Sequence, residues 1–189
     1  DNDSGRFLIF DSNQDLRHVS EFINYDTPFA AFPDFGAWAY SSTNLSIKIR
    51  CGSVGQNGNG GHSHNDQMSF EASFSGHRYF VDPGTYVYTP WPDWRNLFRS
   101  TRYHNVLNVE NLEQNNWLEG ISGLFSMTEL ADLEVLNADQ SLWQGRLTVA
   151  DYCWTRSLYF AKDVLEGSDK VNTTLAHLHF HLHQPVPVS

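Results

Sequence analysis

Short runs of alternating apolar and polar side chains are the feature that most constrains the fold of this chain. In residues 68–74, for example, every second side chain is apolar and the residues between them are polar. Runs of this kind, separated by turn residues, occupy residues 37–42, 45–51, 68–74, 78–82, 103–110, 145–152 and 154–162. Alternation with a period of two is typical of strands with one buried face, and many short strands at this spacing predict an antiparallel β-sandwich. We therefore expect an all-β fold.

Composition and charge narrow the class of partners. With 189 residues and 40% hydrophobic content, the chain is long enough for one domain with a substantial core. The net charge of −10 disfavours nucleic acid and anionic membranes as partners. No apolar run reaches the roughly 18 residues that predict a membrane span. Cys51 and Cys153 are the only cysteines, which excludes a disulfide framework and leaves their redox state open.

The segment GGHSHND at residues 60–66 puts ionisable groups where the strand of residues 68–74 would continue. Read backwards from that strand, the apolar parity passes through Asp66, His64 and His62. Both histidines would then point to the same side of the strand. Buried polar groups need partners, and a metal ion or a substrate can supply them. A pair of histidines that is satisfied within the protein explains the pattern as well.

Two further motifs carry candidate functional residues. Asp82 ends an apolar run and is followed by Pro-Gly, so it is either a site carboxylate or the start of an ordinary Asx-turn. Arg95, Arg99 and Arg102 are spaced four and three residues apart, and one or two helical turns would gather them on one side. Such a cluster can bind a carboxylate or sulfate group, or it can form surface ion pairs.

Aromatic and histidine-rich segments allow two interpretations each. Trp91 and Trp94 can stack on sugar rings, but we interpret them as core residues, which is the more common role of tryptophan in a sandwich. The tail HLHFHLH, residues 177–183, places four histidines on one face of a strand. We interpret that face as solvated rather than as a metal site.

Three of these motifs together resemble the heparinase II/III-like family of polysaccharide lyases. They are HSHND at 62–66, VDPGTY at 81–86 and FRSTRYHN at 98–105. The resemblance implies a helical toroid followed by a C-terminal antiparallel β-sandwich of the supersandwich type. Residues 1–35, which include helical periodicity at 14–25, would be the end of the toroid or the linker from it. Residues 36–189 would form the sandwich domain, which can extend beyond the end of this chain.

The resemblance also implies a metal site and a catalytic residue. By position, the metal ligands would be His64, Asp82 and His104, and His62 would face the substrate. Two histidines and a carboxylate suit zinc, with another divalent cation as the alternative. In this family the metal is regarded as structural, because it shapes the cleft instead of activating water.

Strand register alone does not bring Asp82 to His64. A tight turn at residues 75–77 would leave the two side chains five or six residues out of register, which is roughly 16–20 Å along the strands. A bulge, or a curl of the chain within residues 62–67, is therefore needed to close the metal site.

The implied reaction is β-elimination at a uronic acid. It needs a base for the C5 proton, neutralisation of the adjacent carboxylate and a proton for the leaving oxygen at C4. His62 is the candidate catalytic residue, and Arg99 and Arg95 are the candidate substrate-binding residues. Because the family takes a tyrosine and an asparagine or histidine from the toroid, we expect this chain alone to be weakly active or inactive.

The expected partners are an acidic polysaccharide and the upstream toroid domain. Heparin-like chains, chondroitin, alginate and bacterial surface glycans all meet the requirement for a uronic acid or a similar anionic sugar. The resemblance also implies a periplasmic or secreted location.

Two interpretations from other classes stay open. A cupin-like metal-dependent enzyme also uses an H-x-H motif, but it needs a carboxylate four or five positions later, where Met68 and Ser69 stand. The spacing of His104 and Asn108 does fit that class. A non-catalytic carbohydrate-binding sandwich would need neither the metal nor His62.

Overall fold

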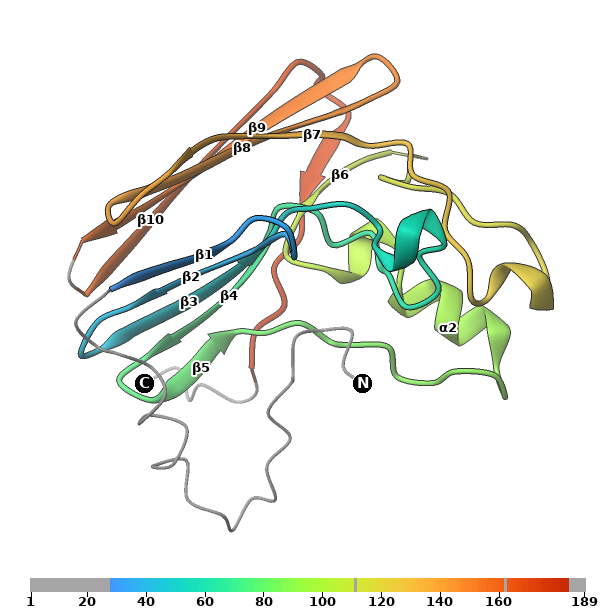
Figure 1. Cartoon of the computed structure of the whole chain (residues 1–189), viewed down its shortest axis with the longest axis horizontal. Helices are drawn as coiled ribbons and strands as arrows, with labels where there is room; N and C mark the ends of the chain where they lie inside the picture. Colours follow the sequence, from blue (N-terminus) through green and yellow to red (C-terminus); the bar gives the residue numbers. More distant parts are fainter. Residues whose placement is uncertain (1–27, 111, 162, 184–189) are drawn as a thin grey trace, which may run out of the picture.

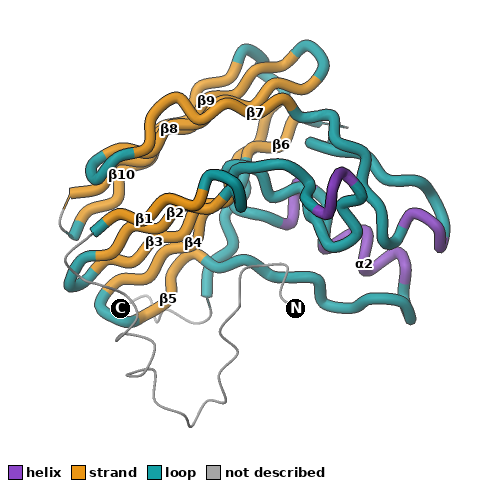
Figure 2. Tube along the Cα trace, in the orientation of Figure 1, coloured by secondary structure: helices purple, strands orange, loops and turns teal. Residues whose placement is uncertain are grey.

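The fold consists of two stacked antiparallel sheets, with loops and short helices gathered at one end (Figures 1 and 2). This computed structural model describes residues 28–110, 112–161 and 163–183. The first sheet has the order β1-β2-β3-β4-β5. Its strands are β1 (Phe29–Phe32), β2 (Ala37–Ser41), β3 (Leu45–Arg50), β4 (Ser69–Phe74) and β5 (His77–Phe80). The predicted antiparallel, mostly β architecture is confirmed.

The second sheet has the order β10-β9-β8-β7, and two further strands form a small separate pair. The bounds are β6 (Leu107–Val109), β7 (Asp132–Ala138), β8 (Leu142–Val149), β9 (Tyr152–Ala161), β10 (Val164–Val171) and β11 (Ala176–Leu178). The helical elements are α2 (Pro92–Phe98) and the 3₁₀ turns η1 (Gln56–Gly58), η2 (Thr101–Tyr103) and η3 (Ile121–Gly123). In the described part, no helix is long and apolar enough to cross a membrane. The predicted helix at 14–25 lies outside the described residues.

Aromatic side chains from the two sheets meet in the core. The ring centroids of Trp38 on β2 and Trp143 on β8 are 5.9 Å apart. Tyr40 stacks on Phe160 of β9 at 4.8 Å. All four side chains are buried, and burial of large rings supplies much of the apolar area that stabilises a sandwich.

The turn between β4 and β5 follows the predicted hairpin. Ser75 and Gly76 both have positive φ, 48° and 77°. Positive φ at both central residues is the signature of the type I′ turn, whose twist matches that of the flanking strands.

Strand β4 begins later than the alternation predicts. It starts at Ser69, and Met68 has φ 63°, which takes the chain out of the extended conformation. Residues 62–67 are therefore a loop, so the prediction of a strand through His62 and His64 is wrong. The curl that the metal site required is present instead.

The histidine-rich tail bridges the two-stranded pair and the first sheet. The backbone N–H of His179 donates to the Val106 carbonyl at 2.9 Å, and that of Val81 donates to the His181 carbonyl at 3.0 Å. His179 and His181 are partly buried, whereas the apolar residues between and beside them are 46–64% exposed: Leu178, Phe180 and Leu182. The interpretation of all four histidines as a solvated face is therefore wrong.

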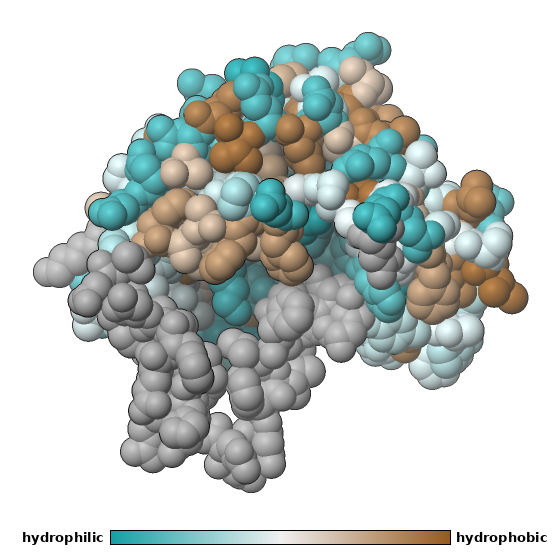
Figure 3. All heavy atoms as spheres, in the orientation of Figure 1, coloured by the Kyte–Doolittle hydropathy of each residue, from teal (hydrophilic) through white to brown (hydrophobic). Residues whose placement is uncertain are grey.

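Apolar side chains are also exposed in the loop around η3. Leu118 is 64% exposed and Ile121 is 75% exposed. Figure 3 shows apolar atoms at the end of the molecule where this loop lies in Figure 1. These two side chains therefore stay outside the core, whereas Leu124 and Met127 of the same loop are buried.

Candidate metal centre

Polar side chains hold the loop that carries His64. The Nδ2 group of Asn65 donates to Glu113 Oε2 at 2.7 Å and to the Asn115 carbonyl at 2.8 Å. The backbone N–H of Gln67 donates to Gln114 Oε1 at 2.9 Å. The loop has no hydrogen bonds to a neighbouring strand, and these bonds take their place. Buried hydrogen-bond networks of this kind hold the backbone in one conformation.

Asp82 follows β5 and starts a tight turn. The Gly84 backbone N–H donates to Asp82 Oδ1 at 2.8 Å. The other oxygen, Oδ2, lies 2.6 Å from Nδ1 of His104. The Asx-turn and the site carboxylate are therefore compatible, because each uses a different oxygen of the same group.

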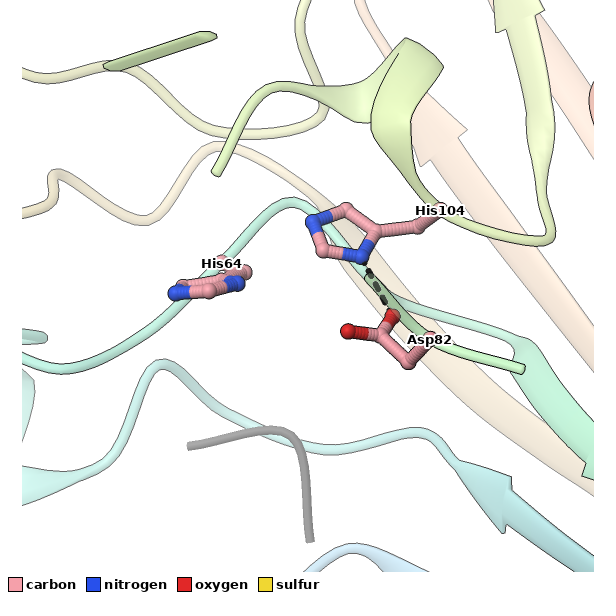
Figure 4. Close-up of side chains that lie close together, drawn as sticks. All are labelled: His64, Asp82 and His104. Carbon is pink, nitrogen blue, oxygen red and sulfur yellow. Dashed lines mark hydrogen bonds and ion pairs between the residues drawn. The ribbon is translucent and has the colours of Figure 1, made fainter. Parts of the chain in front are cut away.

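His64, Asp82 and His104 converge from three separate segments (Figure 4). One ligand atom from each residue lies within 4.8 Å of the other two, and all three residues are buried. The two imidazole ring centroids are 5.2 Å apart. Within the described ranges this is the only such group of three or more His, Cys, Asp or Glu residues. The histidines of the tail form no comparable group there.

The electrostatics of the three residues suit metal binding. Burial, reinforced by His104, lowers the pKa of His64 to about 3, so this imidazole is neutral at physiological pH. Burial disfavours the Asp82 carboxylate, but the charge and hydrogen bond of His104 outweigh it and hold the Asp82 pKa below its ordinary value. Burial likewise disfavours a charged His104, but Asp82 outweighs it and raises the His104 pKa. A metal ion needs neutral imidazoles and an ionised carboxylate, so its binding would displace the proton from His104.

Two unpaired nitrogens show that the residues fit a metal ion. Nε2 of His64 and Nε2 of His104 are buried and have no hydrogen-bond partner in the described part of the chain. A buried polar atom without a partner costs about 1–3 kcal/mol. An ion between the rings would remove that cost, and two imidazoles with one carboxylate are a donor set that zinc prefers.

Comparison with known families agrees with this arrangement. Residues 24–189 match the family described as heparinase II/III-like, C-terminal. The chain belongs to the heparinase II/III-like family. This membership favours the heparinase-like sandwich over a cupin-like fold. No curated protein sequence matches the chain.

Two solved structures with TM-scores above 0.6 support the fold. The heparinase III known as the BT4657 gene product aligns with a TM-score of 0.64 at 19% identity, over 85% of this chain and 25% of its own. Its form with methylated lysines aligns with a TM-score of 0.63 over the same shares. The heparan sulfate lyase HepC from Pedobacter heparinus aligns with a TM-score of 0.42 at 21% identity, over 70% of this chain and 22% of its own. The chain thus spans about a quarter of the length of these proteins.

Asn105 ties the family's HN motif to three neighbouring segments. Its Nδ2 group donates to the carbonyls of Phe70 at 2.9 Å and Val81 at 3.0 Å. Its Oδ1 accepts the backbone N–H of His181 at 2.6 Å. Asn105 directly follows His104, and Val81 directly precedes Asp82. The hydrogen bond between the Asn105 amide and the Val81 carbonyl therefore helps to fix the distance between these two candidate ligands. The motif itself was visible in the sequence, but this role of the asparagine was not.

Arg156 reaches the same site from the second sheet. It is buried on β9, where Asp169 of β10 pairs with its Nε at 2.8 Å and its Nη2 at 3.2 Å. Its Nη1 donates to the carbonyls of Met68 at 2.9 Å and Asn105 at 2.6 Å. One guanidinium therefore links the second sheet to the two segments that carry the candidate histidine ligands. No sequence motif marks this residue, because its acceptors near the site are backbone carbonyls.

His62 and His64 point to different surroundings. His62 is exposed and lies edge-on to Tyr88 at 6.0 Å and to Phe125 at 6.3 Å, measured between ring centroids. His64 is only 2% exposed. The expectation that the pair shares one side is wrong, since residues 62–67 are not a strand. Action of His62 on a substrate stays a prediction.

Arg95 and Arg99 are buried and bind backbone carbonyls. Nε of Arg95 donates to the Leu124 carbonyl at 2.9 Å, and its Nη2 donates to the Gly61 carbonyl at 3.0 Å. Nη2 of Arg99 donates to the Gly123 carbonyl at 2.6 Å. Both guanidinium groups therefore bind carbonyls of the loop around η3 and stabilise its conformation. Binding of a substrate anion by Arg95 or Arg99 stays a prediction.

The third arginine and the two tryptophans lie differently from the expectation. Helix α2 ends at Phe98, so Arg102 is not on it, and its side chain is exposed. Trp91 is 58% exposed and Trp94 is 50% exposed. The interpretation of these tryptophans as core residues is wrong, because the short helix that carries Trp94 lies at the loop end of the molecule, outside the sandwich (Figure 1).

Proposed function

We propose that this chain is the C-terminal sandwich domain of a polysaccharide lyase that cleaves a uronic-acid-containing chain by β-elimination. The observation that carries the proposal is the buried group of His64, Asp82 and His104, with an exposed His62 two residues from the first ligand. It is supported by membership of the heparinase II/III-like family. The names of the matched structures, heparinase III and heparan sulfate lyase, favour heparan sulfate as the first substrate to test.

The reaction breaks one bond to oxygen and forms one double bond. A base takes the proton from C5 of the uronic acid, the C4–C5 double bond forms, and the C4–O bond breaks. The leaving oxygen takes up a proton. The difficult step is the first, because the C5–H is weakly acidic beside an ionised carboxylate, so that carboxylate must be neutralised by hydrogen bonds or a cation.

His62 is the residue of this chain that would act on the sugar. A neutral imidazole can accept the C5 proton, and a protonated one can face the carboxylate. Tyr88 and Phe125 lie edge-on to the ring and restrict where it can turn. The remaining groups would come from an upstream toroid domain, and the chain alone would be weakly active or inactive.

A zinc ion held by His64, Asp82 and His104 would supply structural stabilisation rather than an activated water. By crosslinking three segments, it would stabilise the folded arrangement of the loop from which His62 extends, which the protein's own hydrogen bonds already form. The side chains of Asn65 and Asn105 also hold the ligand-bearing segments in place, through hydrogen bonds around the site. Arg95 and Arg99 would complete the substrate-binding side by holding the loop around η3 in place. An extracellular polysaccharide as substrate would put the protein in the periplasm or outside the cell.

The test compares the chain with and without the upstream toroid. Heparan sulfate, chondroitin sulfate and alginate are supplied, and the unsaturated product is followed by its ultraviolet absorbance. The form with the toroid is expected to turn over one of these substrates, and the chain alone is not. His62→Ala should abolish turnover and retain bound metal, whereas His64→Ala should lose the metal. Arg78→Ala, an exposed change on β5, is the control.

Absence of unsaturated product from every polysaccharide, in a folded and metal-loaded form with the toroid, would refute the proposal. Sugar binding without turnover would instead support the carbohydrate-binding interpretation.

A further inference from the structure

A row of aromatic rings connects helix α2 with the segments that carry Asp82 and His104. We call it the aromatic row, and its members are Tyr86, Trp94, Phe98 and Tyr103. Tyr86 stacks on Phe98 with 4.9 Å between ring centroids and 22° between planes. Trp94 lies 5.7 Å from Tyr86, and Tyr103 lies 5.0 Å from Phe98. The rings therefore form one continuous contact chain rather than four separate side chains.

The outer rings of the row face solvent. Tyr86 is 60% exposed and Trp94 is 50% exposed. Tyr86 also has φ 57°, a backbone conformation that bulky residues rarely adopt. Such a conformation is strained and persists where the surroundings impose it. The fold thus keeps a large ring exposed on a strained backbone.

Arg102 supplies a positive charge at the other end of the row. Its guanidinium carbon lies 5.8 Å from the centroid of the Tyr103 ring. The side chain is exposed, and no carboxylate in the described ranges pairs with it. By contrast, the guanidinium groups of Arg95, Arg99 and Arg156 are buried and occupied by carbonyl or carboxylate acceptors. Arg102 is therefore the member of the predicted arginine cluster that an external anion can reach.

Two members of the aromatic row lie on the segments that carry the candidate ligands. Tyr86 follows Asp82 by four residues, and Tyr103 directly precedes His104. The turn after Asp82 and the η2 turn before His104 therefore position both the metal centre and the row.

We propose that the aromatic row and Arg102 form a subsite for an acidic sugar chain, in which the rings stack on sugar faces and the guanidinium binds a carboxylate or sulfate. Flat exposed rings suit the apolar faces of pyranose rings, and a planar guanidinium matches an anionic oxygen pair. Stacking alone would suit a neutral glycan, and a lone arginine would suit any anion; the combination selects a charged polysaccharide. The substrate class rests on the proposed function.

The test is a direct binding measurement on this chain, which needs no turnover. Titration calorimetry with heparan sulfate and alginate oligosaccharides is compared with a neutral cello-oligosaccharide of equal length. Arg102→Ala should weaken binding of the acidic oligosaccharides by at least about tenfold, as expected for a charge-assisted hydrogen bond. Tyr86→Ala and Trp94→Ala should weaken it several-fold. Arg78→Ala and Tyr159→Ala are matched controls, because both side chains are exposed on other strands.

The outcomes separate this subsite from the proposed function. Equal affinity in the variants and in the unchanged chain, or no binding of acidic oligosaccharide at millimolar concentration, would overturn the subsite. Preference for the neutral oligosaccharide would overturn it too. If the variants instead lose binding of a separately expressed toroid domain and keep sugar affinity, the row is a domain interface and the inference fails. Sugar binding lost in the variants, without any elimination activity in the longer form, would support the subsite and refute the lyase.

Discussion

Replacing Arg156 by methionine tests whether the second sheet supports the metal centre. Methionine keeps an unbranched, flexible side chain on β9 but has no hydrogen-bond donor. The change removes four hydrogen bonds: two to Asp169, one to the Met68 carbonyl and one to the Asn105 carbonyl. The arginine side chain is 1% exposed and the Asp169 side chain 13% exposed, so the pair is almost completely withdrawn from water.

The magnitude follows from what the change leaves unpaired. Removing one partner of a buried ion pair costs about 3–5 kcal/mol, and a buried carbonyl left without a donor costs about 1–3 kcal/mol. These costs are not additive, and Asp169 keeps the hydrogen bond from Trp154 Nε1 at 2.7 Å. We therefore expect Arg156→Met to lower the free energy of unfolding by about 4 kcal/mol, a large share of the 5–15 kcal/mol typical of a domain.

Urea unfolding followed by tryptophan fluorescence measures the change. Arg156→Lys keeps the charge and loses the planar fork, so it should cost less than the methionine variant. The double variant Arg156→Met, Asp169→Leu removes both charges and should recover part of the loss. Zinc affinity at a temperature where each variant is folded should fall as well, because Nη1 fixes the segments of His64 and His104. A cost below about 1 kcal/mol for Arg156→Met, with unchanged zinc affinity, would refute this account.

Three further predictions concern the metal centre itself. Removing metal with a chelator should lower the melting temperature of the unchanged chain and leave that of His64→Ala nearly unaffected, as read by calorimetry. In the metal-free chain, His64 has a folded pKa of about 3 against an ordinary 6.5, so the unfolded state binds its proton first. The free energy of unfolding that depends on this group is therefore fully present above pH 6.5. Below pH 6.5 it should fall by up to about 1.4 kcal/mol per pH unit. Urea titrations of His64→Gln at several pH values should lack this contribution. Asn105→Ala should cost about 2–3 kcal/mol in the same assay and weaken zinc binding, whereas Asn108→Ala, a partly buried neighbour on β6, should do neither.

Central strands could be predicted from the sequence, and the edge strands of the second sheet could not. Strands β2, β3, β4, β8 and β9 have buried faces, and a buried face imposes the alternation that the sequence shows. Strands β7 and β10 lie at the two edges of the second sheet and are mostly exposed. Polar and charged residues are favoured at such edges because they discourage pairing with other chains. Their alternation is therefore hidden, and only the ladder to β8 or β9 defines them.

The candidate site, too, could be predicted only in part from the sequence. The residue types of His64, Asp82 and His104 pointed to a metal site through the family resemblance. Their convergence depends on the loop at 62–67, which is held by a side chain and a backbone carbonyl about 50 residues away. Arg156 is 51 residues from its acceptor Asn105 and binds a backbone carbonyl, which has no signature in a sequence.

The number of contacts that hold the metal centre from outside argues that it is formed before the metal binds. The His64 loop is fixed by Asn65, the turn at Asp82 by its own glycine, and the His104 segment by Asn105. Among the described residues, the buried atoms without a hydrogen-bond partner include Nε2 of His64 and Nε2 of His104, and also Nε2 of Gln67 in the same loop. A site assembled by the metal would leave more of its backbone unsatisfied. Hydrogen exchange should therefore be similar in residues 62–67 with and without zinc, apart from a uniform shift that reflects global stability. A selective rise of exchange in that loop on metal removal would show that the ion folds it.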